Sequence, residues 1–230
     1  RIDRSYTSDV DFGGANLVGE NWTLSPFKFV VPDGADILLF SSAKHGFVRF
    51  KPTGTTGEWK ADGPTTQRLR ESTVTIGSIT HDTWELAEPG SWSTHFKRDG
   101  NRSPTPPTAP DPTYLPICHT DPYGNMSVWQ YRQIFAESPV SSQANVLRLD
   151  RIFLHGTDSS NCAAELEFDW WGPEAGESWG SLRAITVLRR NVAGEQEVTD
   201  RVEYAYHLGD ASTHMDVGTP GDLVQASVYK

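Results

Sequence analysis

The chain has 230 residues, a formal net charge of −10 at pH 7, 37% hydrophobic residues and 11% aromatic residues. This aromatic content, with 22% charged residues, excludes a disordered chain, and no run approaches the roughly 18 apolar residues that a membrane span requires. A negative charge without a cluster of Lys or Arg argues against nucleic acid or anionic lipid as a partner, because both need a concentrated positive surface. We therefore expect a folded protein without membrane insertion.

The N-terminal half consists of short apolar runs separated by turn residues. Residues 27–31 (FKFVV) precede a Pro-Asp-Gly turn, residues 36–41 are nearly all apolar, and residues 46–51 and 73–79 have strand-like composition. No long stretch carries a 3.6-residue apolar period, so the pattern predicts an all-β fold of consecutive antiparallel hairpins. The chain starts at Arg1 without an apolar leader, and we expect a processed protein or a piece of a longer one.

A proline-rich segment divides the chain. Residues 103–112 contain five prolines, which cannot pair as a central strand because proline lacks the backbone N–H. The sequence predicts a β module over residues 1–102, a connector or surface loop over 103–113 and a second β module over 114–230. Two separate domains and one sheet system crossed by a loop both fit this pattern.

An internal repeat fills the C-terminal half. Residues 166–170 (LEFDW) match 202–206 (VEYAY), and each is followed by a second matching run, at 180–187 and at 221–228. A weaker first copy has Trp129 and Tyr131 as its aromatic pair, with residues 147–152 as the return run. Each copy predicts a hairpin whose two aromatic side chains point to one face. Single hairpins are marginally stable in water, so the copies are expected to pair into a twisted sheet or a sandwich.

These motifs resemble the RHS (YD-repeat) family. The resemblance lies in residues 120–125 (TDPYGN) with Trp129 and Tyr131, in 203–206 (EYAY) and in 221–227 (GDLVQAS). Residues 19–22 and 96–101 are similar to the module that precedes the repeats in such proteins. The family often has Asp after the second aromatic, where this chain has Trp171 and His207, and the loops 172–179 and 207–220 are longer than usual. The resemblance implies a large extracellular chain whose β-ribbons form a shell or stalk.

Two groups of polar side chains are candidates for a catalytic or metal-binding site. Glu167 and Asp169 share one face of a predicted strand and could serve glycoside hydrolysis or bind Ca²⁺, or they could simply be solvated. The densest set of metal-ligating side chains lies in the loop 207–220. Two His and two Asp there could hold a divalent cation, and otherwise no cofactor is expected. The members of this set are His207, Asp210, His214 and Asp216.

Cys118 and Cys162 are the only cysteines. A disulfide between them would contribute about 4 kcal/mol in the chain-entropy model, and two buried free thiols are the alternative. Cys118 is followed by His119, but adjacent strand residues point to opposite faces, which disfavours a Cys–His nucleophile.

The tryptophans at residues 170, 171 and 179 suggest a surface for stacking sugars. The repeat predicts that Trp170 is in the core, because Tyr206 replaces it at the matching position. Trp171 is then expected on the opposite, exposed face, with Trp179 in the following loop.

Taken together, these features predict a non-enzymatic, extracellular or cell-surface β protein of RHS type with a structural or adhesive role. Its expected partners are other copies of itself or the flanking repeats of a longer chain, joined through open sheet edges. The alternative is a carbohydrate-binding β-sandwich that uses Trp171 and Trp179 with loop carboxylates. A hydrolase with two carboxylates from different strands is the third hypothesis.

Overall fold

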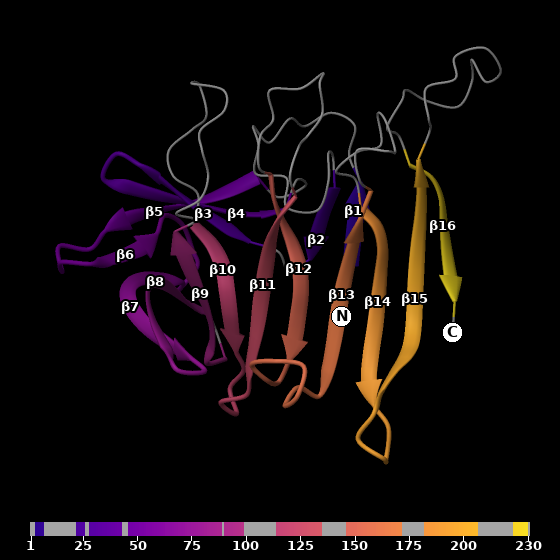
Figure 1. Ribbon diagram of the computed structural model, residues 1–230. Helices are drawn as coiled ribbons and strands as arrows, with labels where there is room; N and C mark the ends of the chain where they lie inside the picture. Colours follow the sequence, from indigo (N-terminus) through magenta and orange to yellow (C-terminus); the bar gives the residue numbers. More distant parts are fainter. Residues whose placement is uncertain are drawn as a thin grey trace, which may run out of the picture.

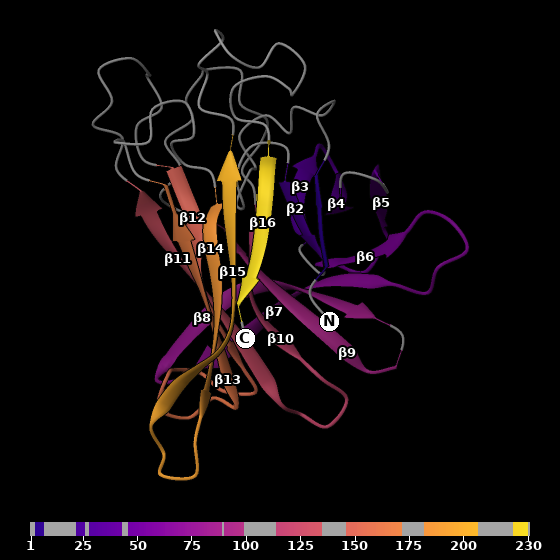
Figure 2. The ribbon, with the colours of Figure 1, turned by 90° about the vertical axis from the view of Figure 1, so that its right-hand side faces the viewer.

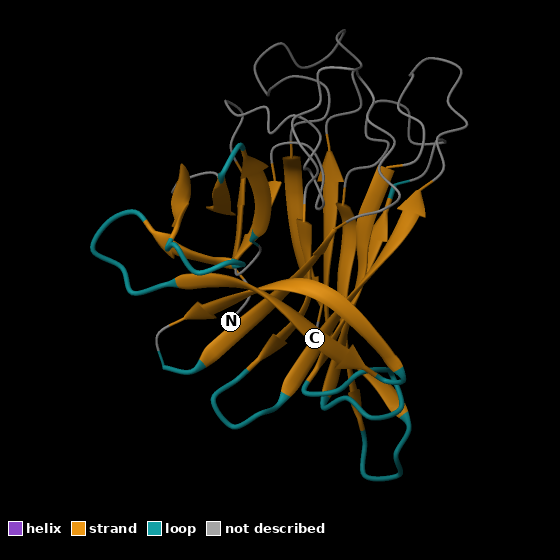
Figure 3. Ribbon diagram, turned by 90° about the vertical axis from the view of Figure 1, so that its left-hand side faces the viewer, coloured by secondary structure: helices purple, strands orange, loops and turns teal. Residues whose placement is uncertain are grey.

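The computed structural model describes residues 3–6, 22–25, 28–42, 46–88, 90–98, 114–134, 146–171, 182–206 and 223–229. These stretches consist of strands and turns, and they contain no helix long and apolar enough to cross a membrane. The prediction of an all-β fold built from consecutive antiparallel hairpins is confirmed (Figures 1 and 3). A separate two-stranded sheet is formed by β1 (Asp3–Tyr6) and β2 (Trp22–Ser25).

Eight strands close into a barrel, which lies on the left in Figure 1. Its strands follow chain order, and closure comes from β9 pairing with β10 over six residue pairs. At the start of β10, Tyr114 also pairs with Val30 of β3. The barrel strands are β3 (Phe29–Asp33), β4 (Asp36–Ser42), β5 (Gly46–Pro52), β6 (Glu58–Ala61), β7 (Arg68–Ile76), β8 (Ile79–Glu88), β9 (Trp92–Arg98) and β10 (Tyr114–Thr120).

One apolar cluster fills the barrel. Each strand from β3 to β9 contributes at least one buried side chain to it, and a single cluster shared by that many barrel strands must lie inside the barrel. The largest members are Phe50 and Phe96, both with no exposed surface. The full set is Val30, Ile37, Leu39, Phe50, Ala61, Leu69, Leu86 and Phe96.

Six more strands extend the sheet away from β10 in chain order, each antiparallel to the one before (Figure 2). This extension carries the three hairpins that the repeat predicted. Its strands are β11 (Met126–Ile134), β12 (Val146–Leu154), β13 (Ala164–Trp170), β14 (Leu182–Arg190), β15 (Gln196–Tyr206) and β16 (Leu223–Tyr229).

The sheet is continuous across the predicted division of the chain into two modules. The connector at 103–113 lies outside the described residues, as do residues 99–102 at the end of the first predicted module. The strands on either side of it, β9 and β10, are directly paired, so strands from both halves of the chain belong to one sheet. The hydrophobic pattern of each segment could not predict that β9 pairs with β10. These two strands lie on either side of the proline-rich segment, which has no strand pattern of its own.

Candidate functional site

The three hairpins of the extension share one irregularity. In each of them the return strand holds one extra residue directly beside the second aromatic of the repeat. Trp170 pairs with Leu182, Tyr206 with Leu223 and Tyr131 with Leu149, and the extra residues are Arg183, Val224 and Asp150. Such bulges bend a strand and redirect side chains. The internal repeat of the sequence therefore corresponds to a repeated structural unit. The sequence predicted the hairpins of this unit but not their bulges.

One face of the extension is apolar. Trp170 is 6% exposed, which confirms its predicted place in the core, and its indole nitrogen donates a hydrogen bond of 2.8 Å to the backbone carbonyl of Leu149. The buried cluster on this face comprises Trp129, Leu149, Ile152, Leu166, Phe168, Trp170, Leu182 and Tyr204.

The opposite face carries ion pairs. Glu167 lies 3.1 Å from Nη2 of Arg151, and Asp169 lies 3.7 Å from Nε of Arg183. Each of these two candidate carboxylates is therefore beside an arginine of a neighbouring strand, an arrangement typical of a charged sheet surface rather than of a pair of acids that share a substrate.

Trp171 is less exposed than the sequence predicted. It follows the last residue of β13 and so is not bound to the alternation of the strand. Its side chain is partly buried and packs against the same apolar cluster as Trp170, so it is less exposed than predicted. Its indole Nε1 is buried and has no hydrogen-bond partner among the described residues. The guanidinium of Arg183 lies over its ring, 4.9 Å from the ring centre.

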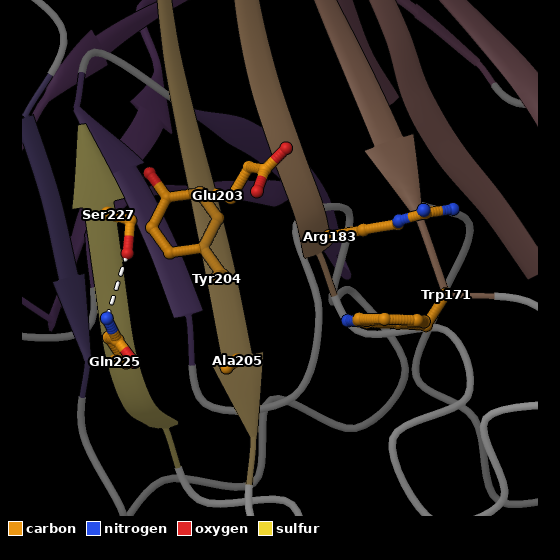
Figure 4. A pocket seen from close by; sticks show the side chains of 7 residues that line it. All are labelled: Trp171, Arg183, Glu203, Tyr204, Ala205, Gln225 and Ser227. Atoms are coloured by element: carbon orange, nitrogen blue, oxygen red, sulfur yellow. Dashed lines mark hydrogen bonds between the residues drawn. The ribbon is translucent and has the colours of Figure 1, made fainter. Parts of the chain in front are cut away.

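An open pocket of about 230 Å³ lies beside this Trp–Arg pair (Figure 4). The bulge at residue 183 places Arg183 next to Trp171, and β15 and β16 supply the other wall. In that wall the side-chain amide of Gln225 donates a 3.0 Å hydrogen bond to the hydroxyl of Ser227. The residues that line the pocket are Trp171, Arg183, Glu203, Tyr204, Ala205, Gln225 and Ser227.

The charges in the pocket are balanced by neighbours. Arg201 donates a 2.8 Å hydrogen bond to Glu203, and this bond, with a smaller contribution from the charge of Arg183, lowers the pKa of the Glu203 carboxyl. Sequence reasoning singled out Trp171 but missed the other lining residues, because they come together only through the register of β14, β15 and β16.

The outer edge of the extension is β16. In the described part of the chain it is the end strand of the large sheet. The strand at the other end of the order, β9, is paired with β10 and so leaves no open edge. None of its seven residues (LVQASVY) is charged or proline, the residues with which natural proteins protect an edge. Val228 and Tyr229 on this strand are 63% and 53% exposed.

Cys118 and Cys162 are free, buried thiols in one apolar cluster with Val74, Val128 and Phe153. The structure thus holds the second of the two alternatives left open by the sequence. Burial raises the pKa of Cys118 to about 12, which leaves it a weak nucleophile.

His119 lies apart from that thiol cluster. Its Nδ1 is hydrogen-bonded to the hydroxyl of Thr94 at 2.9 Å, and its ring stacks on Trp92 with the ring centres 5.0 Å apart. Burial lowers its pKa.

The remaining predicted site residues are Trp179, His207, Asp210, His214 and Asp216, and all of them lie outside the described residues. The predicted sugar-stacking role of Trp179 and the predicted metal site therefore stay predictions. Among the residues that are described, no three His, Cys, Asp or Glu side chains are grouped so as to hold a metal ion.

The fold defines a class of protein: a closed antiparallel β-barrel continued by a row of bulged hairpins. No family model matches the sequence, and no curated protein matches it. Among solved structures the chain is similar to the N-terminal domain of effector protein SpvB from Salmonella typhimurium strain LT2, with a TM-score of 0.58 and 11% identity over 100% of this chain and 93% of that one.

Two toxin structures have a similar fold. The chain matches TcdB2-TccC3-Cdc42 with a TM-score of 0.55 and 12% identity over 85% of its length, and the Photorhabdus luminescens Tc holotoxin pore with a TM-score of 0.53 and 14% identity over 87%. It spans only 13% of each of those chains. At such identities the likeness shows the fold, and it supports the resemblance to RHS proteins in its coarse form, a β-rich fold shared with toxin proteins.

Proposed function

We propose that this chain is a non-enzymatic structural module of RHS type whose last strand, β16, pairs with a further β-strand. The observation that carries the proposal is the unprotected edge. Strand addition supplies main-chain hydrogen bonds along the whole edge, and exposed apolar side chains add to the contact. Val228 and Tyr229 would lose their exposed apolar surface in such a pairing.

The added strand is proposed to come from another copy of the chain or from flanking repeats of a longer chain. The hairpin repeat supports this, because β16 ends a hairpin that has the same bulge as the two before it. A fourth copy placed beside β16 would continue the series without changing its geometry.

We further propose that the module works outside the cell or at its surface. The support is the fold it shares with proteins described as an effector and as parts of a Tc holotoxin. Enzymatic activity is not part of the proposal, since the paired carboxylates are matched by arginines and the thiol of Cys118 is buried.

Sedimentation velocity of the 230-residue chain over a range of concentrations tests the proposal. We expect association that Val228→Lys weakens at least about tenfold, because a charge on an edge strand opposes pairing. The matched control is Val192→Lys, which adds the same charge at an exposed hairpin tip away from the edge.

Hydrogen exchange separates the two proposed sources of the strand. If a flanking repeat is the partner, the isolated chain stays monomeric and the outward-facing amides of β16 exchange quickly. A monomer in which the amides of β16 are as well protected as those of β14 would contradict the proposal, because the edge would then already be covered.

A further inference from the structure

We propose that the pocket between Trp171 and β16 binds a single neutral sugar ring. The site is independent of the sheet edge, because it lies on the face formed by β14, β15 and β16 and not along the outer side of β16 (Figure 4). Four properties of the pocket lead to this ligand class: its size, its charge balance, its mixture of donors and acceptors, and its aromatic wall.

The size restricts the ligand to one ring. At about 230 Å³ the pocket is smaller than the roughly 300–1,000 Å³ of pockets that take drug-sized molecules. It is also open to solvent on one side, so a ring could enter while the rest of a glycan stays outside.

The charge balance favours a neutral ligand. Arg183 lies near Asp169, and Glu203 is hydrogen-bonded to Arg201, so two positive groups face two negative ones. An acidic ligand inside the pocket would lie close to the carboxylate of Glu203. A basic ligand inside the pocket would lie close to the guanidinium of Arg183. A charged ligand would thus meet a like charge in either case, whereas a neutral polyol would meet none.

The polar groups match hydroxyls, which both donate and accept hydrogen bonds. Arg183 can only donate, and Glu203 can only accept. The hydroxyl of Ser227 accepts the hydrogen bond from the Gln225 amide and so keeps its own proton to donate, while the Gln225 side-chain carbonyl is an acceptor. A sugar ring with neighbouring hydroxyls can satisfy both kinds of group.

The wall of the pocket includes two aromatic side chains. Trp171 and Tyr204 line the pocket, and aromatic rings with a few well-placed polar groups are typical of small-ligand sites. The buried Nε1 of Trp171 also has no partner among the described residues. Buried unsatisfied donors are rare in folded proteins, which marks this wall as unlike the rest of the core.

Nuclear magnetic resonance of the ¹⁵N-labelled chain tests the proposal with named probes. The neutral probes are D-glucose, D-galactose, D-mannose and N-acetyl-D-glucosamine, and the acidic probes are N-acetylneuraminate and L-glutamate. We expect at least one neutral sugar to shift the indole N–H resonance of Trp171, assigned with Trp171→Phe, and the amides of Gln225 and Ser227. The expected dissociation constant is about 1–10 mM, the weak range typical of a few hydrogen bonds in an open pocket.

Two variants examine the polar groups. Arg183→Gln and Gln225→Ala should each weaken the binding at least about tenfold, and Gln225 is exposed, so its truncation leaves the fold intact. The matched control is Arg189→Gln, an exposed arginine of the same strand that does not line the pocket.

Three results would overturn the proposal. The first is an absence of shifts with all four neutral sugars at about 100 mM, far above the expected dissociation constant. The second is stronger binding of either acidic probe, which would show that the pocket selects charge. The third is an equal loss of binding in Arg189→Gln, which would show that overall charge and not the pocket is responsible.

Discussion

Trp170 of β13 reaches across to Leu149 of β12, where its indole N–H donates a hydrogen bond to the backbone carbonyl. Leu149 is itself the residue opposite Tyr131, directly beside the bulge residue Asp150 of the first hairpin. The second aromatic of one repeat is therefore fastened to the bulge region of the preceding repeat. This contact makes the hairpins interdependent, and it accounts for an aromatic ring at this position better than apolar area alone.

The first prediction concerns this contact. Trp170→Ala removes a nearly fully buried ring and its hydrogen bond, so we expect the free energy of unfolding to fall by about 3–5 kcal/mol. Trp170→Phe keeps most of the volume but leaves the Leu149 carbonyl without its indole donor, and should cost about 1–3 kcal/mol. Urea unfolding measures both. A loss below 1 kcal/mol in Trp170→Ala, within the range of surface substitutions, would contradict the assignment of Trp170 to the core.

The second prediction concerns two turns that lie at the same end of the extension (Figures 1 and 3). At one turn the Asp121 carboxylate accepts hydrogen bonds from the backbone N–H groups of Tyr123 and Asn125. At the other, the Asn191 side chain accepts them from the N–H groups of residues 193 and 195. Both turns need a positive φ at the fourth position, 86° at Gly124 and 83° at Gly194.

Gly124→Ala and Gly194→Ala should therefore each lower stability by about 1–2 kcal/mol, because an L side chain in this conformation is strained. An added Cβ would meet no atom within 4 Å at either site, so the cost is conformational and not steric. Gly194→Asn is the matched control and should cost less than Gly194→Ala, since Asn adopts this conformation more readily. Thermal unfolding gives the ranking, and equal losses for Ala and Asn would exclude the conformational explanation.

Much of this architecture could be predicted from local sequence. The aromatic pairs at 168 and 170 and at 204 and 206 indicated hairpins, and the burial of Trp170 followed from the repeat. Three features could not be predicted. The barrel depends on the pairing of β9 with β10, the bulge at Arg183 depends on cross-strand register, and the partial burial of Trp171 depends on its contact with a cluster built from several strands. Each is a relation between segments rather than a property of one.

The third prediction concerns pH. Burial lowers the pKa of His95 and of His119, each of which is hydrogen-bonded to a threonine hydroxyl through Nδ1. A histidine with a lowered pKa binds fewer protons when folded than when unfolded. Its contribution to stability is full above the unfolded pKa of about 6.5 and is lost as the pH falls below that value.

We therefore expect the urea concentration at the unfolding midpoint to decrease as the pH is lowered from 7.5 to 5.5. The double substitution His95→Gln, His119→Gln should make the midpoint less dependent on pH. His155→Gln is the control because that side chain is exposed. Asp121 does not act in this window, since hydrogen bonds from Asn125 and the backbone lower its pKa below the usual carboxyl range. A pH dependence that persists in the double variant would show that other groups cause it.

The fourth prediction concerns the thiols. Cys118 and Cys162 are buried, and burial raises the pKa of both. At pH 8 the native chain should react with iodoacetamide at least about a hundredfold more slowly than the same chain in guanidinium, where an ordinary thiol has a pKa of about 8.5. Without reductant, the unfolded chain should show two thiols by mass spectrometry. Finding none would establish a disulfide and contradict the free thiols of the structure.

The last prediction concerns a buried carboxylate. Glu165 is only 1% exposed, and it accepts hydrogen bonds of 2.7 Å from Arg151 and 2.8 Å from the side-chain amide of Gln196. In this pair the acid is buried and the Arg151 side chain is 39% exposed, so removing the arginine leaves the buried charge of Glu165 uncompensated, whereas replacing both partners by apolar groups is often nearly neutral. Arg151→Met should therefore lower the free energy of unfolding by about 3 kcal/mol, and the added substitution Glu165→Leu should restore most of the loss.

Arg132→Met is the matched control for that pair. Arg132 is exposed on the neighbouring strand β11 and contacts Asp150 at 3.1 Å, so its loss should cost no more than about 1 kcal/mol. The double-mutant cycle of Arg151 and Glu165 then gives a coupling energy that is free of the desolvation cost of the stranded acid. If Glu165→Leu lowers the stability of Arg151→Met further instead of restoring it, Glu165 is stabilised by Gln196 and the backbone rather than by Arg151. The ion pair would then not be the reason that an acid is tolerated at this position of the sheet.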